Sequence, residues 1–210
     1  MLRVIAGRVK GRKLKTVPGD TTRPVTDMVK EALFNILGED VIDSRWWDVF
    51  GGTGAIGIEA LSREATFIRF TDINRLPVET IKENLAVCGL SAQAEVRRAD
   101  AFAMLKLPPD SHFDYIYIAP PQYKEMWSQA LKVVDGNPGW LTETGEVIVQ
   151  IHPREYQDIP LANLQKFDER KYGSTLLIFY ESIPMQKPGL PSRAETGITI
   201  PCRNRDYHEK

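Results

Sequence analysis

The sequence is short of cysteine, histidine and net charge, and it has no long apolar run. Its 210 residues include two cysteines and three histidines, and the formal net charge is −1. Cys88 and Cys202 lie far apart and lack the spacing of metal ligands, so we expect neither a disulfide scaffold nor a metal centre. No run is long enough to cross a bilayer and no signal peptide is recognisable, so we expect no membrane contact and a reducing, cytoplasmic compartment, with an organellar matrix or stroma left open.

Without an overall positive charge, any contact with nucleic acid must come from a local cluster of basic residues. The first 19 residues form such a cluster, with no acidic residue before Asp20. Residues 4–6 and 14–17 are typical of two short strands, so we expect a basic hairpin that projects from the body and neutralises RNA phosphates. A solvated charged arm is the alternative. The candidate RNA contacts are Arg3, Arg8, Lys10, Arg12, Lys13 and Lys15.

A further candidate RNA contact, Arg23, lies just before a predicted helix. The helix is indicated by apolar residues on one face, with Thr26 or Asp27 as its N-cap and Gly38 at its end. A guanidinium held at this place could reach a phosphate or a ligand carboxylate, while a salt bridge to Asp27 or Glu31 is the alternative.

A glycine cluster between a strand and a helix organises the middle of the chain. A largely apolar run from Trp46 to Phe50 leads into the cluster, and a helical pattern follows it. The G-x-G-x-x-G spacing predicts a loop that lets a ligand approach the backbone and the N–H groups of a helix N-terminus. NAD enzymes and S-adenosylmethionine (SAM) enzymes share this pattern, and glycines that serve only helix–strand packing are the alternative. The candidate cofactor residues here are Asp48, Phe50, Gly51, Gly52, Thr53, Gly54 and Gly57.

Two further acids follow predicted strands. Asp72 ends the strand that begins at Phe67, about 20 residues after the first glycines, where a carboxylate can accept both ribose hydroxyls. Asp100 follows a strand at residues 94–98 and is placed to read an adenine. Capping of the next helix is the alternative for each acid. With the glycine loop, these sites indicate a nucleoside ligand, and the candidate contacts are Asp72, Ile73, Asp100, Ala101 and Phe102.

A fourth predicted strand, residues 113–118, runs into Ala119-Pro120-Pro121-Gln122-Tyr123. Two prolines remove two backbone donors and leave nearby carbonyl groups free to hold an amino group. This loop resembles that of class I SAM-dependent methyltransferases that modify exocyclic amines of nucleobases, in which the fourth strand typically ends in Asp/Asn-Pro-Pro-Tyr/Phe.

More closely, the chain resembles the RsmD family of 16S rRNA guanine-N2 methyltransferases, from about residue 2 to residue 181. The most specific motif is Thr22-Arg23-Pro24 followed by Glu31-Ala32-Leu33-Phe34-Asn35-Ile36-Leu37. The other matching segments are Arg3-Val4-Ile5-Ala6-Gly7 with Gly11-Arg12, the glycine loop, Gly57 with Glu59-Ala60-Leu61-Ser62-Arg63, and Tyr172-Gly173.

The resemblance implies an α/β class fold, a Rossmann-like domain whose seven-stranded sheet carries helices on both faces, in addition to the basic hairpin. It also implies SAM as the methyl donor and a guanine of 16S rRNA, in an assembling small subunit, as the acceptor. We expect a monomer divided into a basic arm at 1–22, a SAM-dependent methyltransferase domain at 23–183 and a polar, proline-containing tail at 184–210. The C-terminal third predicts a core helix at 124–134 and strands at 146–151, 164–170 and 174–180.

One departure from the family pattern affects the chemistry. Ala119 stands where the family has Asp or Asn, and Gln122 intervenes before the aromatic residue. We expect Gln122 or main-chain carbonyls of Ala119 and Pro120 to hold the amine protons, and Tyr123 to stack on a flipped base. The candidate catalytic residues are therefore Ala119, Pro120, Pro121, Gln122 and Tyr123.

Three other functions compete with rRNA methylation. An inactive SAM-binding or RNA-binding assembly factor is favoured by Ala119. An NAD-dependent oxidoreductase is permitted by the glycine loop, but it explains neither the Pro-Pro loop nor the basic arm. A DNA adenine methyltransferase shares the Pro-Pro loop, but it would be expected to carry the Asp or Asn and a larger target-recognition region.

Overall fold

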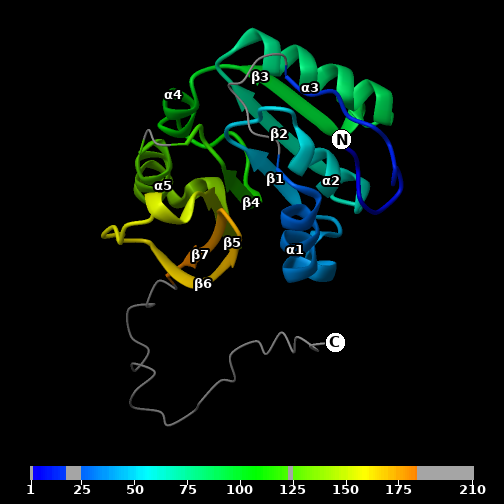
Figure 1. Ribbon diagram of the computed structural model, residues 1–210. Helices are drawn as coiled ribbons and strands as arrows, with labels where there is room; N and C mark the ends of the chain where they lie inside the picture. The colour runs from blue at the N-terminus through cyan, green and yellow to red at the C-terminus, as the bar shows by residue number, and fades with distance from the viewer. Residues whose placement is uncertain (1, 18–24, 123–124, 184–210) are drawn as a thin grey trace.

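The computed structural model describes residues 2–17, 25–122 and 125–183 (Figure 1). The predicted RNA contact Arg23, the predicted base contact Tyr123 and the predicted tail 184–210 lie outside these residues. In the described part, no helix is long and apolar enough to cross a membrane.

The chain folds around one seven-stranded sheet in the order β3-β2-β1-β4-β5-β7-β6. The five strands from β3 to β5 pair in parallel, whereas β7 and β6 add an antiparallel edge. This arrangement confirms the predicted Rossmann-like methyltransferase sheet. The strands are β1 Arg45–Asp48, β2 Phe67–Asp72, β3 Ala94–Arg98, β4 Phe113–Ile118, β5 Leu141–Ile151, β6 Leu164–Tyr172 and β7 Thr175–Ser182.

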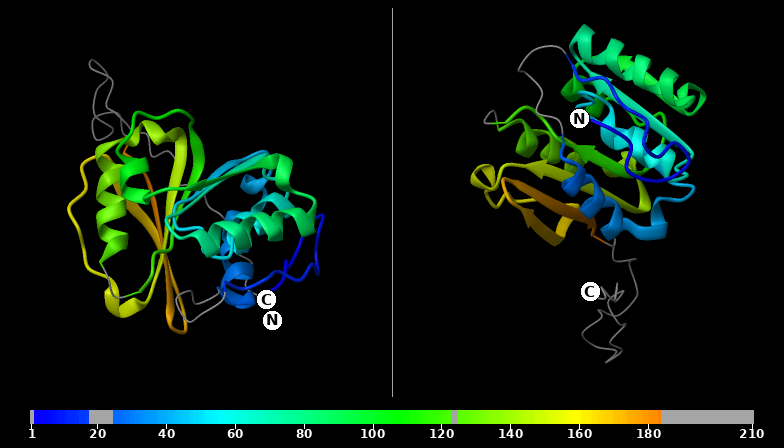
Figure 2. Two further views of the ribbon diagram at one scale, coloured as in Figure 1. Left: turned by 90° about the horizontal axis from the view of Figure 1, so that it is seen from above. Right: turned by 45° about the vertical axis from the view of Figure 1, so that its right-hand side comes forward.

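Helices cover both faces of the sheet (Figure 2). Successive side chains of a strand point to opposite faces, so Trp46 packs in the core beneath α1, α2 and α3, while Trp47 packs in the core beneath α4 and α5. Both indoles are fully buried. The helices are α1 Asp27–Leu37, α2 Ala55–Ser62, α3 Arg75–Cys88, α4 Ala101–Leu105 and α5 Met126–Gly136, with 3-10 turns at Gly38–Val41, Ser91–Gln93, Pro138–Trp140 and Pro153–Glu155.

Local capping sets the boundaries of α1 and α3. The Thr26 side chain accepts a hydrogen bond from the Val29 N–H and caps α1, which ends at Gly38. α3 ends at Gly89, whose left-handed φ of 69° suits glycine. Cys88, on the last turn of α3, is buried.

β5 is longer than predicted. We expected a strand at 146–151, but it begins at Leu141, which pairs with Phe113 across an irregularity in the β4–β5 register. A Cβ added at Gly145 would lie 2.9 Å from the Phe113 carbonyl oxygen. The glycine therefore lets the strand continue past this crowded point, where a loop was expected.

The N-terminal arm differs from the expected projecting hairpin. Its two halves share only one β-bridge, Arg3 with Lys13, so neither half forms a regular strand within the described residues. The arm also lies along α2 and α3 rather than projecting from the body (Figure 1). It packs there because it buries four apolar side chains, and these are Leu2, Val4, Leu14 and Val17.

Candidate cofactor and acceptor site

A cavity of about 930 Å³ opens at the carboxyl ends of β1, β2 and β4. Ligands bind at this edge of open α/β sheets, where the strand order reverses. Most of the residues predicted from the sequence meet here, because the loops that follow these parallel strands converge at one edge. The predicted residues that line the cavity are Asp48, Phe50, Gly51, Gly52, Thr53, Asp72, Ile73, Asp100, Ala101, Phe102, Ala119, Pro120, Pro121 and Gln122.

The glycine loop has fewer free N–H groups than its sequence predicts. The Gly51 N–H donates to the Thr71 carbonyl at 2.8 Å, and the Gly54 N–H donates to the Gly51 carbonyl at 2.7 Å. The Gly52 N–H donates to Asp72 Oδ2 at 3.2 Å. Three donors that could have faced a phosphate are thus used within the protein.

Two of the predicted cofactor glycines, Gly54 and Gly57, serve packing and do not line the cavity. A Cβ at Gly57 would lie 2.0 Å from Ile68 Cδ1 and 2.6 Å from the Phe70 ring. Gly54 has a φ of 75°, and a Cβ there would lie 3.2 Å from Ile81. Glycine is therefore required at position 57 because α2 approaches β2 closely. This is the packing role given above as the alternative to ligand binding.

Asp48 is the most unusual polar group of the cavity. Its side chain is buried at the end of β1, and its Oδ1 atom has no hydrogen-bond partner within the described residues. Burial, reinforced by the nearby negative charge of Asp72, raises the pKa of Asp48 to about 7. The Phe50 backbone donates a hydrogen bond to this carboxylate, but a buried oxygen left without a partner is costly, so the site favours a cation or a strong donor beside Oδ1.

Asp72 bridges the glycine loop and the start of α3. Its Oδ2 accepts from the Gly52 N–H, and its Oδ1 accepts from the Asn74 N–H at 2.9 Å. Asn74, not Asp72, is the N-cap residue of α3. Burial raises the pKa of Asp72, and the two backbone donors oppose that rise.

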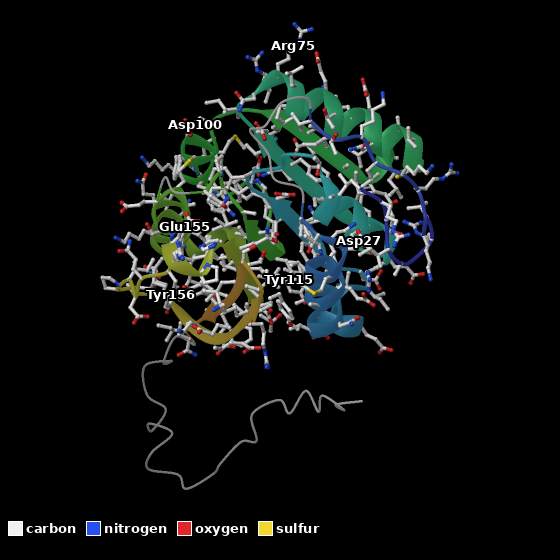
Figure 3. The ribbon with its side chains drawn as sticks, viewed as in Figure 1. Asp27, Arg75, Asp100, Tyr115, Glu155 and Tyr156 are labelled. Carbon is white, nitrogen blue, oxygen red and sulfur yellow. The ribbon has the colours of Figure 1, made fainter. Side chains whose placement is uncertain are left out.

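Asp100 caps α4, as the capping alternative predicted. Asp100 is labelled in Figure 3. Its Oδ1 accepts from the N–H groups of Phe102 and Ala103 at 2.8 and 3.1 Å. The carboxylate stays exposed at the cavity, and the Phe102 ring packs edge-on against Phe50 at 6.1 Å between centroids. Two aromatic side chains and an acid therefore stand together at this end of the cavity.

Sequence reasoning missed Tyr117 and Gln150, which line the opposite end of the cavity. The Tyr117 hydroxyl donates to Gln150 Oε1 at 2.5 Å. Burial raises the pKa of Tyr117 well above its usual value, so the phenol stays protonated. The signal that could have found Gln150 is a polar residue within the apolar end of β5. The other lining residues outside the predicted set include Val17, Val25, Met126 and Thr175.

The basic arm carries its charges on an exposed surface. Arg3 pairs with Asp27 at 3.0 Å and Lys15 with Glu83 at 2.7 Å, and Arg8 donates to Gln93. The remaining three basic side chains make no ion pair with any described residue, and these are Lys10, Arg12 and Lys13. In the same described part, no group of three His, Cys, Asp or Glu side chains could hold a metal ion.

The chain matches known proteins over the segment that builds this site. A family described as Conserved hypothetical protein 95 matches residues 2–181. Ribosomal RNA small subunit methyltransferase D from Haemophilus influenzae is 33% identical, covering 85% of this chain and 91% of the relative. The protein of the same name from Escherichia coli K12 is 31% identical, covering 86% and 89%. The chain belongs to the RsmD family.

Solved structures share the fold of this RsmD-family chain. A structure from Escherichia coli, described provisionally as a methyltransferase, is 28% identical with a TM-score of 0.77, and the match covers 86% of this chain and 97% of the other. An RNA methyltransferase from Salinibacter ruber in complex with S-adenosylhomocysteine is 14% identical with a TM-score of 0.59, covering 80% and 97%. The second likeness concerns the fold alone.

Proposed function

We propose that this RsmD-family chain transfers a methyl group from SAM to the exocyclic N2 amine of a guanine in small-subunit rRNA, acting as a monomer on an assembling subunit. The observation that carries the proposal is the buried Asp48 carboxylate, whose Oδ1 atom has no hydrogen-bond partner among the described residues, in a cavity that also holds Asp72 and Asp100. Such a cavity suits a nucleoside that carries positive charge. SAM has that chemistry, since it bears an ammonium group and a sulfonium centre.

The residues present fit SAM in three places. Asp48 would accept from the ammonium group and Asp72 from the ribose hydroxyls. Asp100 and Phe102 would bind the adenine, which the Salinibacter ruber relative also holds as part of S-adenosylhomocysteine. When bound, SAM supplies a methyl group on a positively charged sulfur. The protein's own contribution is to hold donor and acceptor in line, and positioning of this kind accounts for much of such an acceleration.

The hydrogen bonding of the glycine loop does not favour the NAD-dependent oxidoreductase alternative. A dinucleotide needs free N–H groups for its pyrophosphate at the helix N-terminus. Here the Gly51, Gly52 and Gly54 N–H groups are bound within the protein. The aspartates around the cavity would also repel a pyrophosphate, whereas they attract a cation.

The acceptor base would lie at the Pro-Pro loop. Pro120, Pro121 and Gln122 line the cavity next to Ala119, whose methyl group cannot accept a hydrogen bond. The guanine amine must lose conjugation with its ring before its nitrogen can attack, and acceptors that hold the amine protons favour that change. The Gln122 side chain and the Pro120 carbonyl are our candidates for these acceptors, and Tyr123 is our candidate for stacking on the base.

The activity test uses unmethylated small-subunit rRNA or its assembly particles with labelled SAM, and identifies the product nucleoside by mass. N2-methylguanosine is expected. Gln122→Ala should slow transfer while leaving the affinity for SAM unchanged, and full activity would leave main-chain carbonyls as the acceptors. Binding of SAM and rRNA without any transfer would instead support the assembly-factor alternative that Ala119 raises.

Removing basic side chains from the N-terminal arm tests whether the arm binds RNA. We expect Ala at Lys10, Arg12 and Lys13 to weaken RNA binding and to lower the salt slope by about 2, because three phosphate contacts to single-stranded RNA release about 0.7 counterions each. The matched control removes three exposed lysines away from the arm, at Lys106, Lys132 and Lys171. Equal salt slopes of RNA binding for the two triple variants would show that the arm is only a solvated charged segment.

A further inference from the structure

The N-terminal arm is fastened to α2 through backbone contacts. The Ile5 and Ala6 N–H groups donate to the two carboxylate oxygens of Glu59 at 2.8 and 2.9 Å, and Glu59 is fully buried. Gly7 passes so close to α2 that an added Cβ would lie 1.9 Å from the Ser62 carbonyl oxygen. The first half of the arm is therefore anchored to α2.

Asn84, on α3, joins the far end of this arm to the glycine loop. Its Oδ1 accepts from the Lys15 N–H at 2.7 Å. Its Nδ2 donates to the Lys15 carbonyl and to the Thr53 carbonyl, each at 3.0 Å. Asn84 is only 1% exposed, so water does not replace these bonds. One buried amide thus holds a residue of the arm and a residue of the loop.

The partners of Asn84 leave its amide one orientation. The Lys15 N–H can only donate, and the two carbonyls can only accept, so the oxygen must face the arm and the nitrogen must bridge arm and loop. Two residues beyond Lys15, Val17 lines the cofactor cavity. A displacement of the Thr53 carbonyl therefore disturbs the backbone that continues into the cavity wall.

We propose that Asn84 is a positioning residue that couples the cofactor cavity to the basic arm, so that a ligand in the cavity tightens RNA binding. This inference rests on the proposed function. A ligand that contacts the glycine loop restrains the Thr53 carbonyl and, through Asn84, the Lys15 backbone. RNA that then binds at Lys10, Arg12 and Lys13 meets an arm that is already ordered. Such coupling is reciprocal, so RNA must tighten ligand binding by the same factor.

The first experiment uses the wild-type chain. The affinity for S-adenosylhomocysteine is measured by calorimetry alone and with a saturating unmethylated transcript of small-subunit rRNA, and the RNA affinity is measured with and without S-adenosylhomocysteine. We expect each ligand to tighten the other by about fivefold or more. Equal affinities in the presence and absence of the second ligand overturn the inference.

The second experiment assigns the coupling to Asn84. Asn84→Asp keeps an acceptor for the Lys15 N–H but loses both donors, so the coupling factor should fall to near one. The matched control is Glu83→Ala, on the same helix. Glu83 pairs with the Lys15 side chain at 2.7 Å and has no hydrogen bond to the described glycine loop, so its variant should keep the wild-type factor. A purely structural Asn84 would weaken both ligands and leave their coupling unchanged, which would overturn the positioning role.

The outcomes separate this inference from the proposed function. A wild-type chain that binds neither S-adenosylhomocysteine nor rRNA overturns the proposed function, and the inference with it. A chain that binds both ligands independently overturns the coupling alone and leaves the methyltransferase proposal intact.

Discussion

Replacing Asp48 by Asn tests the electrostatic design of the cavity. Asn keeps the shape of the side chain and removes its charge, so the proposed partner of the ligand ammonium is lost. In the wild type, burial and Asp72 raise the pKa of Asp48 to about 7. The free protein therefore holds this carboxyl protonated below that pH, and a cationic ligand must release the proton before it can pair with the carboxylate.

The size of the effect follows from that pKa. At pH 6 only about a tenth of the Asp48 side chains are ionised, so the affinity for S-adenosylhomocysteine should be about eightfold weaker than at pH 7.5. The amide of the Asp48→Asn variant cannot ionise, so the affinity of that variant should stay flat over this interval. Asp72→Asn is the control. Removing the negative charge of Asp72 should lower the pKa of Asp48 and move the step to lower pH without abolishing it.

The assay is calorimetric titration with S-adenosylhomocysteine at several pH values and constant ionic strength, in buffers of different ionisation enthalpy. Below pH 7 the wild type should release about one proton per ligand bound, and the variant should release none. A flat affinity for the wild type, or an unchanged affinity and proton count for Asp48→Asn, would refute the assignment of Asp48 to a cationic group.

The same substitution should stabilise the free protein at high pH. The pKa of Asp48 rises from 3.8 to about 7 on folding, so the native state holds this proton more tightly than the unfolded state. The free energy of unfolding should then fall as pH rises from about 4 to 7, by up to about 4 kcal/mol. Asp48→Asn removes that loss, so urea unfolding should show that the stability of the variant relative to wild type is greater at pH 8 than at pH 5 by about 2.5 kcal/mol. A wild type that is equally stable at both pH values would contradict the raised pKa.

Three further substitutions test single contacts. Glu59→Gln should destabilise the chain by roughly 3 kcal/mol in urea unfolding, because it removes the buried negative partner of Lys30 and an anchor of the arm. A loss of stability below about 0.5 kcal/mol would show that the anchor is dispensable. Gly57→Ala should lower the free energy of unfolding by about 1 to 3 kcal/mol despite the better helix propensity of Ala, since the Cβ would overlap Ile68. A higher thermal midpoint for this variant would disprove the packing role. Asp72→Ala should weaken S-adenosylhomocysteine binding, and an unchanged dissociation constant would remove its ribose role.

Much of the fold could be read from the sequence because it depends on local patterns. Strands β3 and β4 have the predicted bounds, and the cap of α1, Thr26, is one of the two residues predicted for it. The acids Asp72 and Asp100 meet at the cavity because each follows a parallel strand, and the carboxyl ends of parallel strands share one edge. A strand period and a turn signal span only a few residues, so they need no knowledge of distant partners.

The tertiary structure decided what depends on contacts between distant parts of the chain. The glycine spacing could not show that Gly57 serves packing, because its neighbour Ile68 lies on β2, a separate element. The basic run did not reveal that its backbone docks on the buried carboxylate of Glu59, more than 50 residues away. Nor could helical periodicity distinguish Asn84 from other polar residues of α3. The sequence by itself determined the order of the elements and the acids at the sheet edge. Only folding decided which polar groups lose water and must find partners, and these groups line the proposed cofactor site and connect its glycine loop to the arm.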